Sequence, residues 1–434
     1  MKIAMIGTGY VGLVSGACFA SLGHHVTCVD SDDTKIAALE AGRIPFYEPG
    51  LADLVAESRA AGRLAFSRSL AQGIEGAQAI FICVGTPAKE SDGTADLTFL
   101  DAAAAQIGRA LKDHAVIVVK STAPIGTGDA VEAIMREAGA RDFSVASNPE
   151  FLREGAAIGD FLRPDRIVIG VEDERAKATM TAIYRPLADA GAPVLTMRRR
   201  SAELTKYAAN VFLAMKVTFI NEIADLCEAV GGDIADVAEG IGRDPRIGRR
   251  FLNAGPGFGG SCFPKDTVAL TRIAAKARSP MRLVETLVDV NIKRKIAMAA
   301  KIAGACGGDV KGLRIAVLGL TYKPETDDMR DAPSLTIVPA LQAKGAHVVA
   351  YDPEGMERAR PLLPGVEFAR DAEACAYGAD ALVLLTEWSA FGALDFAAIK
   401  RGMASDILVD LRNALDHGAL RALGFHVTGI GKGA

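Results

Sequence analysis

Short apolar runs of strand length alternate with longer stretches of helical period over much of the chain. Near the amino terminus, Lys2–Ile6 predicts a buried strand, the positions up to Leu22 predict a helix, and His25–Val29 predicts the next strand. The further strand-like runs in this half are Ala79–Val84, Ala115–Val119, Ser144–Ser147 and Ile167–Val171. Strands that alternate with helices are typical of a doubly wound α/β fold with a parallel sheet.

A second series of the same kind follows in the last third of the chain. Its strand-like runs are Gly312–Leu318, Ala346–Tyr351, Ala381–Leu385 and Ile407–Val409. An acid, Asp352, follows the second of these runs, as Asp30 follows the second strand of the first series. After the opening run, however, Gly319-Leu320-Thr321 lacks the later glycines of a dinucleotide motif, so a nucleotide diphosphate fits there better than a full dinucleotide. We expect the tail, Gly429–Ala434, to be loose.

The segment between the two series is helical. Apolar residues recur at helical spacing from Ser201 to about Val230, and Gly231-Gly232 is a plausible stop. Two more helices are expected, from about Pro264 to Ala277 and then up to about Ala303. The predicted fold class is therefore α/β, with two Rossmann-like doubly wound domains joined by a long central helix and a helical middle domain. The expected domains are residues 1–197, 198–305 and 306–434.

The first strand and helix enclose Gly7-Thr8-Gly9-Tyr10-Val11-Gly12, a GxGxxG turn. In such a turn the first glycine allows the sharp bend, the second lets a pyrophosphate approach, and the third lets the helix pack on the strand. Asp30 at the end of the second strand would accept hydrogen bonds from ribose hydroxyls. No arginine follows Asp30 to bind a 2′-phosphate, so the sequence predicts NAD rather than NADP as the cofactor.

Composition excludes several classes of protein. Half of the 434 residues are hydrophobic, 24% are charged and the formal net charge is -4, which does not suggest nucleic acid or a polybasic membrane patch as a partner. The apolar runs are far shorter than a membrane span, and because a strand pattern starts at the first residues we expect no signal peptide. The seven cysteines show no CxxC pair and no metal spacing. We expect a cytoplasmic protein without a structural metal.

The segment Gly255-Pro256-Gly257-Phe258-Gly259-Gly260-Ser261-Cys262-Phe263-Pro264-Lys265-Asp266 places a cysteine after a run of glycines. Pro264 is well tolerated in the first turn of a helix, so we expect Cys262 at or just before a helix N-terminus. The unpaired backbone amides and the helix dipole favour a thiolate there. Lys265 adds positive charge, and Asp266 lies one helical turn away. The pattern therefore predicts a nucleophilic cysteine.

The run GFGGSCFPKD resembles the nucleophile segment of the nucleotide-sugar dehydrogenases that make uronic acids. The resemblance extends over nearly the whole chain. NPEFLREG at Asn148–Gly155 resembles the substrate loop of that family, and SAELTKYAANVFLA matches its segment with an active-site lysine and asparagine. The sequence around Cys262 fits the branch that acts on UDP-glucose. The branches that act on GDP-mannose or UDP-N-acetylmannosamine share the architecture and remain alternatives.

The resemblance implies contacts that the residues alone would not reveal. The NAD contacts implied beyond the three glycines and Asp30 are Tyr10, Val11, Lys35, Thr86, Thr122, Glu154, Lys265 and Arg330. The implied contacts with the sugar nucleotide are Glu150, Phe151, Leu152, Glu154, Lys206, Asn210, Arg246, Phe251, Leu252, Asn253, Gly255, Gly259, Tyr322, Lys323 and Arg412. In the family the arginine at the position of Arg246 reaches the neighbouring subunit's site, which implies a homodimer.

The same residues suggest a four-electron oxidation of a primary alcohol to a uronic acid. Lys206 and Asn210 share one helix face and would supply a proton acceptor and a donor to the developing oxyanion. Cys262 would hold the aldehyde as a thiohemiacetal and then as a thioester. Thr122, Glu150 and Asp266 are candidates to position or activate the hydrolytic water.

Two other classes also fit part of the pattern. Dehydrogenases of 3-hydroxyacyl-CoA or 6-phosphogluconate combine GxGxxG with a helical middle domain, but they perform one oxidation and need no cysteine. A binding protein that senses NAD would bind the cofactor and form no NADH with any sugar nucleotide.

Overall fold

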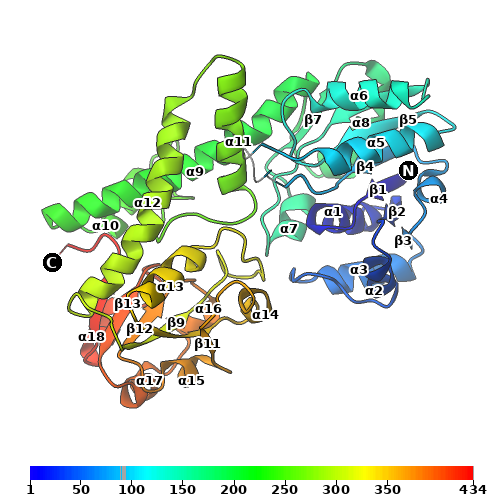
Figure 1. Ribbon diagram of the computed structural model, residues 1–434. Coiled ribbons are helices and arrows are strands. Elements are labelled where there is room, and N and C mark those ends of the chain that lie inside the picture. Colours follow the sequence, from blue (N-terminus) through cyan, green and yellow to red (C-terminus); the bar gives the residue numbers. More distant parts are fainter. Residues whose placement is uncertain (88, 90–93, 434) are drawn as a thin grey trace. The chain divides into compact units, whose positions relative to one another are not determined.

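A computed structural model describes residues 1–87, 89 and 94–433 of the chain (Figure 1). The chain forms two compact units, Met1–Ala209 and Asn210–Ala434, and each contains its own β-sheet. The α/β class and the two Rossmann-like folds are confirmed. The division into domains at residues 197 and 305 stays a prediction.

The sheet of the first unit has the strand order β3-β2-β1-β4-β5-β6-β7-β8. Strands β1 to β6 are parallel, as predicted, in the order of a dinucleotide-binding fold. Strand β7 pairs antiparallel with β6, and β8 is parallel to β7. The strands are β1 (Lys2–Ile6), β2 (His25–Val29), β3 (Leu64–Ser67), β4 (Ala79–Ile82), β5 (Ala115–Val119), β6 (Phe143–Ser147), β7 (Ile167–Val171) and β8 (Val194–Met197).

Two strands of this sheet were not predicted. Strands β3 and β8 lie at its two edges and are only partly buried, so neither has the continuous apolar run that marks a central strand. Strand β4 also ends two residues earlier than expected, at Ile82. The carbonyl oxygen of Val84 instead accepts a hydrogen bond from the Ser121 hydroxyl at 2.7 Å.

Helices cover both faces of this sheet (Figure 1). Alternate residues of β1 point to opposite sides, with Ile3 and Met5 in one core cluster and Ala4 and Ile6 in the other. The cluster with Ile3 includes residues of α1 (Tyr10–Ser21), α2 (Asp33–Glu40), α3 (Leu51–Ala60), α7 (Ala157–Leu162) and α8 (Glu174–Asp189). The cluster with Ala4 includes residues of α4 (Leu70–Ile74), α5 (Thr98–Ala110) and α6 (Thr127–Glu137).

The sheet of the second unit repeats the order of the first six strands. Its order is β11-β10-β9-β12-β13-β14, and all pairs are parallel. The first residues of the predicted runs at 312 and 346 lie outside the strands. The strands are β9 (Arg314–Leu318), β10 (His347–Tyr351), β11 (Glu367–Phe368), β12 (Ala381–Leu384), β13 (Ile407–Asp410) and β14 (His426–Gly429).

Helices again form two layers in the second unit. One core cluster joins the sheet to the second half of α9 (Arg199–Val230), α10 (Ile234–Gly242), α12 (Arg282–Ala305) and α13 (Ser334–Ala343). The cluster on the other face includes residues of α15 (Ala372–Ala376), α16 (Ser389–Gly392), α17 (Phe396–Gly402) and α18 (His417–Ala422). The remaining helices are α11 (Phe263–Lys276) and α14 (Met356–Ala359).

The expectation of a loose tail is wrong for the described residues up to Gly433. Gly429 ends β14, and the side chain of Ile430 is fully buried. The amide of Gly431 donates to Glu228 at 2.7 Å, and Lys432 forms an ion pair with Asp233 at 2.7 Å. These long-range contacts order the segment although its sequence resembles a flexible end. Ala434 lies outside the described residues.

Candidate active site

The turn between β1 and α1 uses its three glycines in different ways. Gly7 has a positive φ of 101°, and a Cβ there would meet the carbonyl oxygen of Cys83 at 2.9 Å. A Cβ at Gly12 would lie 2.0 Å from the carbonyl oxygen of Gly7, so a larger residue would separate the helix from the turn. A Cβ at Gly9 would meet no described protein atom within 4 Å. Gly9 therefore keeps open the approach of a phosphate group to the helix N-terminus.

Asp30 is held in place as an acceptor at the end of β2. Its carboxylate accepts hydrogen bonds from the Thr8 amide at 2.8 Å, the Thr8 hydroxyl at 2.7 Å and the Asp32 amide at 3.0 Å. Partial burial favours the neutral acid, but these hydrogen bonds and the charge of Lys35 lower the pKa of Asp30 below its ordinary value. An ionised carboxylate offers about four acceptor positions, so Asp30 can still accept from a ribose hydroxyl.

The loops after β4 and β5 are tied to each other. The Thr86 hydroxyl donates to the carbonyl oxygen of Thr122 at 2.7 Å. The structure thus brings together two of the predicted NAD-binding residues, at the carboxyl ends of neighbouring strands. This is the edge of an open α/β sheet at which ligands bind.

A buried ion pair joins the Asn148–Gly155 segment to α9. The Lys206 ammonium lies 2.8 Å from Glu150 Oε1, and the two residues are only 3% and 5% exposed. Glu150 Oε2 accepts from the Leu152 amide at 2.7 Å. Burial favours the neutral form of Glu150, but the charge of Lys206 and the hydrogen bonds from Lys206 and Leu152 lower its pKa below the ordinary value. Glu150 is therefore an ionised carboxylate in a buried position.

Other predicted residues lie around Lys206. Its ammonium is 5.5 Å from the centre of the Phe151 ring, and the Arg166 guanidinium lies 3.6 Å from the same centre. Lys206 also lines a small pocket together with Thr122, Pro149 and other residues of this unit. The structure therefore brings Thr122, Glu150, Phe151 and Lys206 together.

Glu48 orders this region and was not predicted from the sequence. It is buried, and its carboxylate accepts from the Tyr10 hydroxyl, from the Gly155 amide at 2.6 Å and from the Ala157 amide at 2.8 Å. Glu48 thus links the start of α1 to the end of the Asn148–Gly155 segment. Gly155 lies 107 positions away in the sequence, so no local pattern could have indicated the contact.

Cys262 is the N-cap residue of α11, as predicted. Pro264 occupies the first turn of the helix, and the Asp266 amide donates to the Cys262 carbonyl oxygen at 2.8 Å. The side chain is partly exposed, and its Sγ lies 3.5 Å from the Ser261 hydroxyl. The thiol therefore lies at the N-terminus of a 14-residue helix, a position at which the helix dipole favours a negative charge.

Asp266 gathers two of the predicted site residues around one carboxylate. The Asn210 amide group donates to Asp266 Oδ2 at 2.6 Å, and the Lys265 ammonium lies 2.6 Å from Asp266 Oδ1. Asp266 is fully buried, and Asn210 is 7% exposed. Because Asp266 belongs to the first turn of α11, this cluster lies within one turn of Cys262.

The loop before Cys262 is fixed by side chains that sequence reasoning missed. Asn291 accepts from the Phe258 amide at 2.8 Å and donates to its carbonyl oxygen at 3.1 Å. Arg294 donates to the Gly255 carbonyl oxygen at 2.7 Å, and Asn221 accepts from the Gly255 amide at 2.8 Å. Asn221, Asn291 and Arg294 are buried. Asn291 and Arg294 interrupt the apolar face of α12 at helical spacing, and this interruption was the available sequence signal.

Two glycines of the loop pack against the segment after β9. A Cβ at Gly259 would lie 2.3 Å from the Asp331 carbonyl oxygen, and a Cβ at Gly260 would lie 2.6 Å from the Tyr322 ring. The Gly260 amide donates to the Arg330 carbonyl oxygen at 2.8 Å. The glycines are therefore required for close packing within this unit, in addition to any contact with a substrate.

Arg412 lies against two other predicted substrate residues, Gly255 and Tyr322. Its guanidinium donates to the Tyr322 carbonyl oxygen at 3.1 Å and lies 3.0 Å from Glu387. A Cβ at Gly255 would come within 3.4 Å of Arg412 Nη1. The Lys323 ammonium lies 5.4 Å from the centre of the Tyr322 ring. The structure therefore brings four predicted substrate residues close together, namely Gly255, Tyr322, Lys323 and Arg412.

The acid after β10 has a different setting from Asp30. Asp352 is fully buried and accepts from the amides of Leu320, Thr321, Glu354 and Gly355, from the Thr321 hydroxyl and from the Trp388 indole. Its acceptor positions are occupied by the protein itself. Asp352 therefore has no capacity to bind a ribose, which agrees with the prediction that this fold does not hold a full dinucleotide.

The other predicted residues lie in varied settings. Arg246 pairs with Asp244 at 2.6 Å, and its side chain is 86% exposed. Arg330 pairs with Asp328 at 2.7 Å. Leu252 is part of the hydrophobic core, so its side chain does not face a ligand. The remaining predicted residues, which are at least partly exposed, are Val11, Lys35, Glu154, Phe251 and Asn253.

Over residues 1–87, 89 and 94–433, no group of three or more His, Cys, Asp or Glu side chains is arranged to hold a metal ion. Within the same residues, every helix is too short or too polar to span a membrane.

Comparison with known families covers all of these regions. Residues 1–188 match the NAD binding domain of the UDP-glucose/GDP-mannose dehydrogenase family, residues 200–293 match its central domain, and residues 316–417 match its UDP binding domain. The chain belongs to the UDP-glucose/GDP-mannose dehydrogenase family.

Individual members of the UDP-glucose/GDP-mannose dehydrogenase family align over the full chain. The chain is 57% identical to the UDP-glucose 6-dehydrogenase of Rhizobium meliloti (strain 1021), with all of both chains covered. It is 46% identical to the UDP-glucose 6-dehydrogenase TuaD of Bacillus subtilis (strain 168), covering 100% of this chain and 94% of that protein. The solved UDP-glucose dehydrogenase of Pyrobaculum islandicum has 39% identity and a TM-score of 0.92, covering 100% of this chain and 98% of that one.

The family's NAD binding domain contains the GxGxxG turn, Asp30 and the tied loops after β4 and β5. The predicted cofactor, NAD, is therefore confirmed. The open space at Gly9 and the remaining acceptor capacity of Asp30 fit the pyrophosphate and the adenosine ribose. The family's central domain contains Lys206, Asn210, Cys262 and Asp266, and its UDP binding domain contains Tyr322 and Arg412. The individual roles of these residues stay predictions.

Proposed function

We propose that this protein oxidises UDP-glucose to UDP-glucuronate in two successive NAD-dependent steps. The full-length likeness to UDP-glucose 6-dehydrogenases supports the substrate. The observation that supports the second oxidation is the position of Cys262, an N-cap thiol within one turn of the cluster of Asn210, Lys265 and Asp266. An enzyme that performs a single alcohol oxidation needs no such nucleophile.

The first step removes a hydride and a proton from the primary alcohol of the sugar. Bound NAD supplies the hydride acceptor in both oxidations. Lys206, directly or through a water, takes the hydroxyl proton, and the ion pair with Glu150 fixes the position of its amine. Asn210 donates a hydrogen bond to the oxygen that becomes negative. The product of this step is an aldehyde.

In the second step the Cys262 thiolate adds to the aldehyde carbon. A carbon–sulfur bond forms, the carbonyl oxygen takes a proton, and the result is a thiohemiacetal. Loss of a second hydride and of the hydroxyl proton leaves a thioester on Cys262. Covalent attachment keeps the reactive aldehyde on the enzyme between the two oxidations.

Hydrolysis of the thioester completes the reaction. Water adds to the thioester carbon, the carbon–sulfur bond breaks, and the carboxylate product leaves while sulfur regains its initial state. The buried carboxylates of Asp266 and Glu150 and the hydroxyl of Thr122 are the groups proposed to orient or activate this water.

The yield of NADH per UDP-glucose tests the proposal directly. With limiting UDP-glucose and excess NAD, we expect two NADH and one UDP-glucuronate per substrate consumed. The same measurement with GDP-mannose and with UDP-N-acetylmannosamine identifies the sugar nucleotide that is preferred. A yield of one NADH, with the aldehyde released, would exclude the double oxidation. NAD binding without any NADH formation would favour a sensor.

We further propose that the protein is a homodimer in a reducing, cytoplasmic setting. Large apolar side chains are exposed along α9 at Phe212, Phe219 and Leu226, at intervals of seven residues, and Ile292 and Ile296 are exposed on α12. Helices α9 and α12 lie against each other, since Arg294 pairs with Asp225 at 2.8 Å. An apolar strip of this kind is typical of a subunit interface. None of the seven cysteines, all of which lie in the described part, forms a disulfide.

Arg246 is proposed to act in the neighbouring subunit, and its exposed side chain supports this role. Arg246→Ala and Cys262→Ser should each be nearly inactive alone. When they are co-expressed, each mixed dimer should contain one complete site, so activity should return to about a quarter of the wild-type value if subunits pair at random. Absence of any recovery, with mixed dimers shown by differently tagged subunits, would place Arg246 in the site of its own subunit.

A further inference from the structure

Glu203 is a buried carboxylate to which the predicted mechanism gives no role. It lies on α9, three residues before Lys206, and is 6% exposed. Its oxygens accept from the Gly126 amide at 2.6 Å, the Gly128 amide at 2.8 Å and the Ser147 hydroxyl at 2.9 Å. Gly126 is the N-cap position of α6 and offers no capping side chain. Glu203 therefore caps α6 from a different helix.

The capped segment carries Thr122. The chain from Thr122 to Gly126 connects β5 to α6, and its two ends are both fixed. At the first end the Thr122 carbonyl oxygen accepts from Thr86 at 2.7 Å, and at the other end the Gly126 amide donates to Glu203. The position of the Thr122 loop is thus defined relative to α9.

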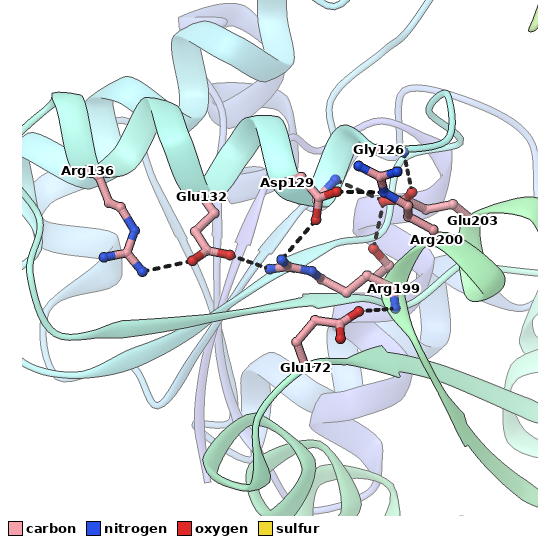
Figure 2. Close-up of polar contacts among 10 residues, drawn as sticks. Gly126, Asp129, Glu132, Arg136, Glu172, Arg199, Arg200 and Glu203 are labelled. Atoms are coloured by element: carbon pink, nitrogen blue, oxygen red, sulfur yellow. Dashed lines mark hydrogen bonds and ion pairs between the residues drawn. The ribbon is translucent and has the colours of Figure 1, made fainter. Parts of the chain in front are cut away.

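The start of α9 is also fixed to α6. Figure 2 shows the Arg199 guanidinium between Asp129 and Glu132, at 2.9 and 2.7 Å, while Glu203 points to Gly126 at the beginning of α6. Arg199 is 7% exposed, and its backbone amide donates to Glu172 at 3.1 Å. These contacts stop α9 from sliding or rotating along α6.

Glu203 and Lys206 are three residues apart and share a face of α9. Glu203, Lys206 and Thr122 line the same small pocket. The protein's own donors occupy the Glu203 carboxylate, while the Lys206 ammonium forms its ion pair with Glu150. Glu203 is therefore suited to fixing the spacing between the Thr122 hydroxyl and the Lys206 amine, and not to exchanging protons itself.

We propose that Glu203 is a positioning residue for the oxidation, which holds the Thr122 loop in register with Lys206. The proposal rests on the proposed function, because it assumes that Thr122 and Lys206 act on the reacting carbon or on its water. A displacement of about 1 Å between reacting groups can lower a rate by about 100-fold. A carboxylate that binds two backbone amides across a helix boundary is able to prevent such a displacement.

Glu203→Gln is the informative variant, because it keeps the shape of the side chain but replaces one acceptor oxygen by a donor group. That donor cannot pair with an amide N–H, so either the Gly126 amide or the Gly128 amide loses its acceptor. We expect kcat to fall by about 10- to 100-fold, with a much smaller change in KM for UDP-glucose. Amide hydrogen exchange of a peptide that covers residues 120–130 should become faster in the protein without ligands.

Glu132→Gln is the matched control. It weakens one of the two ion pairs of Arg199 at the same helix–helix interface, while the pair with Asp129 at 2.9 Å remains and still holds α9 against α6. Among the described contacts, none joins Glu132 to the Thr122 loop or to Lys206. We expect it to match Glu203→Gln in melting temperature within a few degrees while keeping nearly the wild-type kcat.

Two results would overturn the proposal. One is unchanged hydrogen exchange at residues 120–130 in Glu203→Gln. The other is faster exchange with an unchanged kcat, since the loop would then be held without consequence for the reaction. Exchange is measured without substrate, and the NADH yield of the wild-type protein is measured separately. Failure of the proposed function would appear only in the NADH yield of the wild-type protein. Failure of the positioning role would appear in the hydrogen exchange and kcat of the variants.

Discussion

Replacing Cys262 by serine should lower turnover of UDP-glucose to the acid by about three orders of magnitude or more. Cys262 caps α11, where amides and dipole favour a thiolate, whereas a serine hydroxyl remains protonated at neutral pH and is a far weaker nucleophile. NAD binding should be unchanged, because the GxGxxG turn belongs to the first unit. Steady-state NADH formation with product analysis measures the effect.

Cys306→Ser is the control for this variant. Cys306 is also partly exposed, but it follows α12 and contacts none of the predicted site residues in the described contacts. It should retain full activity. In the wild-type protein, acid quenching during turnover should leave a sugar adduct on the peptide that contains Cys262. Full turnover to the acid by Cys262→Ser would remove the thiol from the mechanism.

Replacing Lys206 by methionine should remove activity and also destabilise the protein. Loss of the proton acceptor is expected to cost about 100- to 10,000-fold in kcat. Loss of one partner of the buried pair leaves the Glu150 charge without its neighbour, which costs about 3–5 kcal/mol of folding free energy. Denaturant unfolding at pH 7 measures the second effect.

The stability loss in Lys206→Met should depend on pH in a defined direction. In the wild-type protein the pKa of Glu150 is lowered, so the pair stabilises the fold above the ordinary pKa of 4.5 and this contribution is lost as the pH falls through the lowered value. In the variant the burial that raises the pKa of Glu150 remains while the charge and hydrogen bond of Lys206 are gone, so this pKa is higher than in the wild-type protein and the folded state loses less when Glu150 is protonated. The difference in stability should therefore be largest near pH 7 and shrink toward pH 4.

The double variant Lys206→Met/Glu150→Gln separates the two effects. Removing the carboxylate charge as well should recover most of the lost stability at pH 7, since the buried carboxylate without its Lys206 partner is gone. Activity should not return, because the proton acceptor is still absent. Stability that is equally low in the double variant would show that packing around Lys206, and not charge, causes the loss.

The sequence allowed the fold class and the local parts of the site to be predicted. The GxGxxG turn with Asp30 and the N-cap position of Cys262 each depend on residues close in sequence or on a strand–turn–helix order, so their patterns are visible along the chain. The edge strands β3 and β8 lacked the apolar run that a central strand requires. The ordered tail was mistaken for a flexible end because its partners, Glu228 and Asp233, lie about 200 positions away.

The residues that position the site could not be predicted from the sequence. Glu48, Glu203, Asn221, Asn291 and Arg294 each bind backbone groups that lie 33 to 109 positions away. A carboxylate or amide on a helix is usually solvated, and only the folded partner shows that it is buried and occupied. For this reason the groups with direct chemical roles could be proposed from motifs, whereas the groups that hold them had to await the structure.

The position of Trp388 in the second unit has a practical consequence. Trp388 is the single tryptophan of the chain, and it is buried in the second unit, with its indole donating to Asp352 at 3.2 Å. Intrinsic fluorescence excited at the indole band will therefore report the melting of Asn210–Ala434 alone, while circular dichroism averages over both units. A difference between the two unfolding curves would reveal an intermediate in which one half is molten, without any added label.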